Sequence, residues 1–82
     1  MAAPVNILED YLARAEDYVA LGAEHIAKQK TMVANMESQG LHTTESIRLL
    51  TTFEQLQMVR VAHRDRLRAE LAEARKAVSS SG

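Results

Sequence analysis

Cysteine is absent from the 82 residues of this chain, which excludes disulfide bonds and thiolate metal sites. Aromatic residues make up only 4%, and there are one proline and three glycines to interrupt a helix. No run of residues approaches the roughly 20 apolar positions that a membrane-spanning helix needs. The first residues lack the charged start and apolar stretch of a signal peptide. We therefore expect a cytoplasmic protein.

The charge balance argues against two classes of partner. The net charge of −1 provides no general attraction to nucleic acid or to an anionic membrane. Hydrophobic residues make up 46% and charged residues 26% of the chain, a composition typical of folded proteins. Because Ala, Leu, Glu, Arg and Gln dominate, the composition favours helix. It predicts a single all-α domain over residues 1–82.

A first helix is predicted over about residues 6–38. Asn6 and Glu9 have the spacing of a capping box, in which each side chain bonds a backbone N–H group near the helix start. Apolar or small residues then recur in alternating steps of four and three, the heptad pattern of a coiled coil: Leu8, Leu12, Ala15, Val19, Gly22, Ile26, Gln29, Val33 and Met36. Gly22 permits either a close helix approach or the entry of a large side chain, such as Arg60, from the other helix.

A tight turn is predicted over residues 39–43. Gly40 suits the left-handed position just after a helix, and Leu41 would follow it as in a Schellman motif. Thr43 or Thr44 can cap the next helix. So short a connection makes the two helices antiparallel neighbours. The fold expected is an antiparallel two-helix hairpin.

A second helix is predicted over about residues 44–78, with a frayed tail at 79–82. Its apolar face is wide: Ile47, Leu49, Leu50, Phe53, Leu56, Val59, Leu67, Leu71, Ala74 and Val78, with Met58, Val61 and Ala62 to one side. A contact between two helices needs only a narrow stripe, so the surplus predicts a homodimer that forms a four-helix bundle. The predicted interaction face consists of Leu49, Phe53, Leu56, Met58 and Val61.

Opposite charges separate along the chain. Acidic residues dominate 1–27 and basic residues dominate 60–76, so folding at the turn places the two blocks side by side. His63 and Arg64 are candidates for an anion contact, since arginine binds such groups bidentately. The favoured interpretation is that this basic cluster lies near Glu16 and Asp17 and pairs with them.

A polar layer of His25, Gln29, Glu54 and Gln57 is predicted across the middle of the bundle. We expect it to fix helix register and oligomeric state through hydrogen bonds. The alternative is a ligand-binding or metal-binding site, because His and Glu side chains together can bind zinc or iron. No metal or other cofactor is predicted, because the chain lacks the motifs with which helical bundles hold metals.

Four segments carry a resemblance to known proteins: residues 25–29 (HIAKQ), 40–43 (GLHT), 49–57 (LLTTFEQLQ) and 63–67 (HRDRL). They resemble short uncharacterised helical-hairpin proteins of alphaproteobacteria, such as those of rhizobia, over about residues 23–71. The resemblance implies a bacterial cytosolic hairpin and no particular activity.

Catalytic motifs are missing from the sequence, which shows no catalytic triad, phosphate-binding loop or paired-carboxylate pattern. We therefore expect a small non-enzymatic module. It would bind itself, or another helical protein, through its helix faces.

Overall fold

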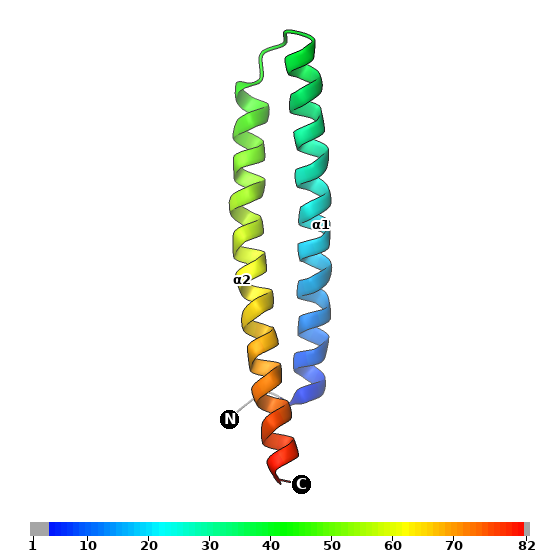
Figure 1. The fold of residues 1–82 in the computed structure, drawn as a ribbon, viewed down its shortest axis with the longest axis vertical. Coiled ribbons are helices and arrows are strands. Elements are labelled where there is room, and N and C mark those ends of the chain that lie inside the picture. Colours follow the sequence, from blue (N-terminus) through cyan, green and yellow to red (C-terminus); the bar gives the residue numbers. More distant parts are fainter. Residues whose placement is uncertain (1–3, 82) are drawn as a thin grey trace.

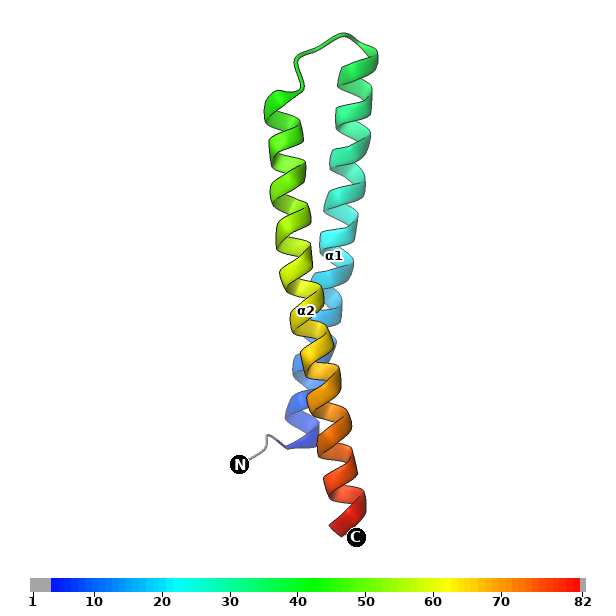
Figure 2. The same ribbon diagram turned by 60° about the vertical axis from the view of Figure 1, so that its left-hand side comes forward.

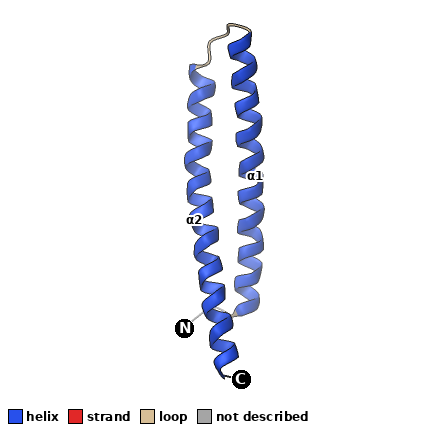
Figure 3. Cartoon of the chain, viewed as in Figure 1, coloured by secondary structure: helices blue, strands red, loops and turns tan. Residues whose placement is uncertain are grey.

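The computed structural model describes residues 4–81, which form two long helices, α1 (Val5–Ser38) and α2 (Thr44–Ser81). The helices run antiparallel and lie side by side along almost their whole length (Figure 1). Apart from Pro4 and the turn at residues 39–43, the described residues are helical (Figure 3). The predicted antiparallel hairpin is confirmed.

The start of α1 differs from the prediction. The N-cap position is Pro4, no side chain caps the helix, and the capping box assigned to Asn6 and Glu9 is wrong. The backbone of Pro4 (φ −58°, ψ 148°) directs its carbonyl oxygen at the N–H groups of Ile7 and Leu8, which both donate to it at 3.1 Å. Pro4 has no N–H group of its own to satisfy, and its carbonyl oxygen accepts the first hydrogen bonds of α1. The helix therefore begins at Val5, one residue earlier than predicted.

The turn follows the prediction closely. Gly40 has a φ of +71°, a left-handed conformation that glycine adopts at little cost. The N–H of Leu41 donates to the Met36 carbonyl at 2.9 Å, and the N–H of Gly40 donates to that of Glu37 at 3.0 Å. These two bonds define the Schellman motif. The second helix begins where the carbonyl of Thr43 accepts the N–H of Ile47 at 2.9 Å.

The end of α2 was predicted too early. The helix continues through residues 79–81 to Ser81, where the sequence predicted a frayed tail; residue 82 lies outside the described residues. No proline or glycine interrupts the chain between Val78 and Ser81, and serine lowers helix stability only slightly. The helix therefore has no local reason to stop at Val78.

The seam, the line along which the helices meet, follows a heptad pattern on both sides. All nine positions predicted for α1, from Leu8 to Met36, are buried or half-buried, which confirms that pattern. The α2 side of the seam is formed by the corresponding inward positions: Ser46, Leu50, Phe53, Gln57, Arg60, Arg64, Leu67, Leu71 and Ala74.

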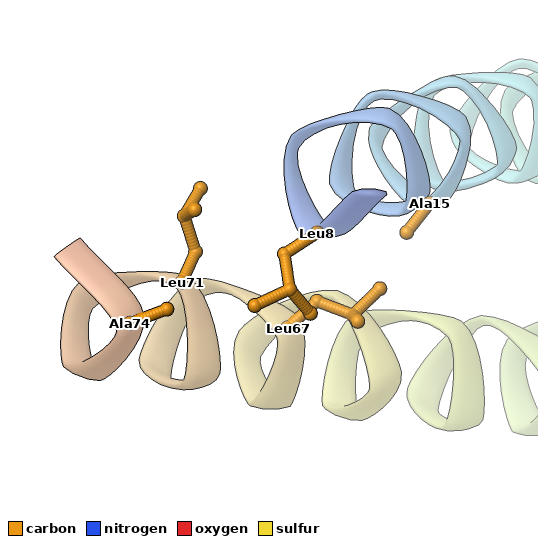
Figure 4. Packing of buried hydrophobic residues seen from close by; sticks show 5 residues of the cluster. All are labelled: Leu8, Ala15, Leu67, Leu71 and Ala74. Carbon is orange, nitrogen blue, oxygen red and sulfur yellow. The ribbon is translucent and has the colours of Figure 1, made fainter. Parts of the chain in front are cut away.

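The apolar core occupies the end of the hairpin opposite the turn. There Leu8, Ala15, Leu67, Leu71 and Ala74 form one buried cluster, against which Val5 and Leu12 pack. Figure 4 shows Leu8 of α1 pointing across to α2 beside Leu67. Toward the turn the seam becomes more polar, and the buried side chain of Gln29 donates to the Ser46 carbonyl at 3.0 Å.

The molecule is a thin rod of 65 × 15 × 14 Å. Its two helices wind gently around each other, so that α2 crosses in front of α1 in the turned view (Figure 2). The radius of gyration is 18.5 Å, whereas a compact chain of this length would have one of about 12 Å. Within residues 4–81, neither helix contains a stretch with the length and hydropathy required to cross a bilayer.

Candidate functional site

Charged and amide side chains occupy the middle of the α2 seam, where the sequence had suggested Gln57 and Arg60 but not Arg64. Gln57, Arg60 and Arg64 are half-buried there. In their place, several large apolar residues lie on the outside of the rod: Ile47, Leu49, Leu56, Met58, Val59 and Val78. The wide apolar face predicted for α2 is therefore only partly buried by the hairpin, and its surplus stays exposed.

One long side of the rod collects most of the exposed apolar side chains. We call it the Tyr18 face and define it by positions spaced seven residues apart, which share one side of a coiled-coil helix: Tyr11, Tyr18, His25 and Met32 of α1, and Leu49, Leu56 and His63 of α2. Along its edges lie Ile7, Leu21 and Val59, three or four residues from these positions. The Leu, Ile, Val, Met and Tyr residues of the face and its edges are between 39% and 65% exposed.

Two hollows lie along the Tyr18 face and share Arg60. One, of about 220 Å³, is lined by Ala15, Tyr18, Arg60 and His63, and the other, of about 100 Å³, by Gly22, His25, Phe53, Leu56 and Arg60. The Arg60 guanidinium carbon lies 6.0 Å from the centre of the Tyr18 ring, within the range of a cation–π contact. The rings of His25 and Phe53 are 5.9 Å apart. No carboxylate lines either hollow.

Gly22 makes room for the polar side chains of the seam. A Cβ atom at this position would collide with Oε1 of Gln57 and lie 3.1 Å from Nη1 of Arg60. Large side chains from α2 thus use the space that Gly22 leaves open, as the sequence suggested for Arg60. The amide of Gln57 donates to the Val19 carbonyl at 2.8 Å, while its Oε1 is buried and has no hydrogen-bond partner among the described residues.

The opposite side of the rod, which we call the Met58 face, contains a groove lined by both apolar and charged residues. Its groove of about 700 Å³ is lined by Ile26, Lys30, Glu54, Gln57, Met58, Val61, Ala62 and Asp65. The side therefore mixes apolar residues with both signs of charge.

The predicted interaction face is divided between these two sides of the rod. Leu49, Phe53 and Leu56 belong to the Tyr18 side, whereas Met58 and Val61 line the Met58 groove. The five residues therefore do not form one continuous surface, and their role in an interface stays a prediction. At 100° per residue, Leu56 and Met58 point about 160° apart around the helix axis.

The predicted polar layer is not assembled. Gln29 and Gln57 bond to backbone carbonyls at different levels of the seam. His25 lies on the Tyr18 face, and Glu54 lies on the Met58 face. The structure therefore separates these four side chains. Among residues 4–81, no group of three His, Asp or Glu side chains is placed to hold a metal ion.

Opposite charges meet across the hairpin, as predicted, but through other arginines. Arg68 donates to Glu16 at 3.1 Å and Arg75 donates to Glu9 at 3.0 Å. Arg64, a candidate for an anion contact, instead donates to its neighbour Asp65 at 3.0 Å. His63, the second candidate, lies in the hollow beside Arg60. The half-buried Arg60, which the sequence suggested only as a side chain entering at Gly22, has no ion pair with any described residue.

Comparison with known proteins assigns the chain to no group. No protein-family model, curated protein sequence or solved structure matches it.

Proposed function

We propose that this protein is a small, non-enzymatic interaction module of the bacterial cytoplasm that acts by self-association through the Tyr18 face. One observation carries the proposal: the exposed apolar side chains concentrate along one side of the rod. Large apolar patches bordered by polar residues on a folded surface commonly mark sites of protein association. In this case the patch extends over most of the rod, so its partner is best sought among long helices.

The exposed area supports the same conclusion. The chain exposes 6103 Å², whereas a compact protein of its mass, 9.1 kDa, would expose about 4,900 Å². The difference is about 1,200 Å², and a standard protein–protein interface removes about 800 Å² from each partner. Pairing of two hairpins into a four-helix bundle would bury a surface of this size.

Sedimentation equilibrium over a hundredfold range of protein concentration tests the proposal. We expect the unmodified chain to populate a dimer. Leu56→Glu, which places a charge on the Tyr18 face, should weaken the dimer at least tenfold. Met58→Glu is the matched control, because it makes the same kind of change two residues away on the opposite side of the same helix.

A folded chain that stays monomeric throughout this concentration range would overturn the proposal. A dimer that Met58→Glu dissociates and Leu56→Glu does not would instead assign self-association to the Met58 face. Circular dichroism of both variants confirms that the helices remain formed.

A further inference from the structure

From the pattern of residues along the Tyr18 face, we infer that two copies pair with their long axes parallel and their turns at the same end. In this arrangement α1 of each copy lies against α2 of the other, and the two-fold axis runs along the rod. The inference rests on the proposed self-association and specifies its geometry.

The printed contacts between the helices fix which residues share a level along the rod. His25 lies beside Phe53, and Tyr18 lies beside Arg60. His25 shares one hollow with Leu56, and Tyr18 shares the next with His63. Stepping seven residues along each helix places Met32 level with Leu49 and Tyr11 level with Glu70.

A two-fold axis along the rod keeps every residue at its own level and brings α1 over α2 of the second copy. Each residue of the face then meets the residue that already shares its level. Met32 would meet Leu49, and His25 would meet Leu56. At the edge, Leu21 would meet Val59, so apolar side chains face one another over the middle of the rod.

Charged residues at the edges are compatible with this pairing. The tyrosine hydroxyl of Tyr11 would lie level with the Glu70 carboxylate, to which it can donate a hydrogen bond. Arg14 and Arg66 would share a level, but Arg14 is highly exposed and already paired with Asp10 at 3.1 Å. Repulsion between exposed charges is weak and is screened by salt.

The antiparallel alternative fits less well. Because the face is centred near Arg60, a two-fold axis across the rod would place the two Arg60 residues on directly facing helices, whereas the axis along the rod places them on diagonally opposite helices. The same operation would lay Leu49 over Glu70 and Glu73, which continue the Tyr18 face toward the end of α2. Unpaired like charges and a leucine against carboxylates both disfavour association.

The absence of cysteine makes single-cysteine variants a direct test. Leu41→Cys, in the exposed turn, carries a spin label away from the face. Pulsed dipolar spectroscopy should then give a distance between copies well below half of the 65 Å rod length. A distance close to the rod length would overturn the inference.

Disulfide trapping provides the second measurement. When Leu21→Cys and Val59→Cys chains are mixed and oxidised, the mixed disulfide should form several-fold faster than either self-disulfide, because only facing cysteines reach bonding distance. Ala27→Cys mixed with Ala62→Cys, two positions outside the Tyr18 face, is the matched control. Preferred self-disulfides of Leu21→Cys would indicate the antiparallel pairing and refute the inference.

The failure of this inference and that of the proposed function are distinguishable. If the unmodified chain is a monomer by sedimentation, the proposed self-association itself fails. If it is a dimer but the turn labels lie far apart, only the parallel arrangement fails.

Discussion

At the scale of single residues, Gly22 and Gln57 depend on each other. Gly22 costs helix stability, because glycine is about 1 kcal/mol less favourable than alanine inside a helix. In this position the missing side chain leaves space for the Gln57 amide, which reaches the Val19 carbonyl. The two residues therefore form one unit, although they lie on different helices.

A double-mutant cycle measures this dependence. We expect Gly22→Ala to stabilise the hairpin by about 1 kcal/mol when Gln57 has been replaced by alanine, since only helix propensity then changes. In the unmodified chain the new methyl group should displace the Gln57 amide, and most of that gain should disappear. Equal effects of Gly22→Ala in both backgrounds, measured by urea denaturation, would show that the two residues are independent.

The buried Oε1 of Gln57 predicts a stabilising substitution. An unpaired buried polar atom costs about 1–3 kcal/mol, and the carbonyl of Val19 keeps its own helical hydrogen bond when the amide is removed. Gln57→Leu should therefore raise the free energy of unfolding by about 1 kcal/mol. Gln55→Leu, an exposed change two residues earlier, should leave it nearly unchanged. A loss of stability on Gln57→Leu would show that the Gln57–Val19 bond outweighs the unpaired oxygen.

At the scale of the helices, the sequence predicted α1 better than α2. Every seam position of α1 follows from the heptad spacing of its small and apolar residues, with Gln29 as the one polar member. In α2 the apolar residues outnumber the seam positions, so their spacing alone does not identify the buried stripe. The stripe in fact includes Gln57, Arg60 and Arg64, and the glycine on the facing helix leaves room for Gln57 and Arg60.

The residues of the Tyr18 face could not be predicted from the sequence of α2 alone. Leu56 and Met58 both look like surplus apolar residues in the sequence, and only the register with α1 separates them onto opposite sides of the rod. The positions at which the helices begin and end could not be predicted from the periodicity of apolar residues alone. The Schellman turn at Gly40 followed from residue type, whereas the start at Pro4 depended on a backbone carbonyl rather than on a side-chain cap.

Leucines of α2 should divide into two classes by position. Leu71 is 4% exposed in the core cluster, and Leu71→Ala should destabilise the hairpin by about 2–4 kcal/mol, as expected for a large buried side chain. Leu49 is 44% exposed, and Leu49→Ala should change the stability of the isolated hairpin by less than about 1 kcal/mol. Urea denaturation at concentrations too low for dimers separates the two classes; a similar loss for both would contradict the division.

At the scale of the whole molecule, the centre of the Tyr18 face gathers cationic groups. His25 and His63 flank Arg60, while Lys28 and Arg66 lie one helical turn beyond the two histidines. The carboxylates that pair across the hairpin, Glu9 and Glu16, occupy the opposite side. Two copies that paired through this face would bring several cations close together, and no carboxylate lines the two hollows beside Arg60.

The position of the core cluster also determines how the hairpin would respond to a mechanical load. The beginning of α1 and the end of α2 lie at the same end of the rod (Figure 1), next to Leu8, Leu71 and Ala74. A force that pulls these ends apart would separate the two helices one layer of the seam at a time, starting at this end and moving toward the turn. The tightest layers would bear it first, and once they had separated, the more polar layers toward the turn would yield at lower force.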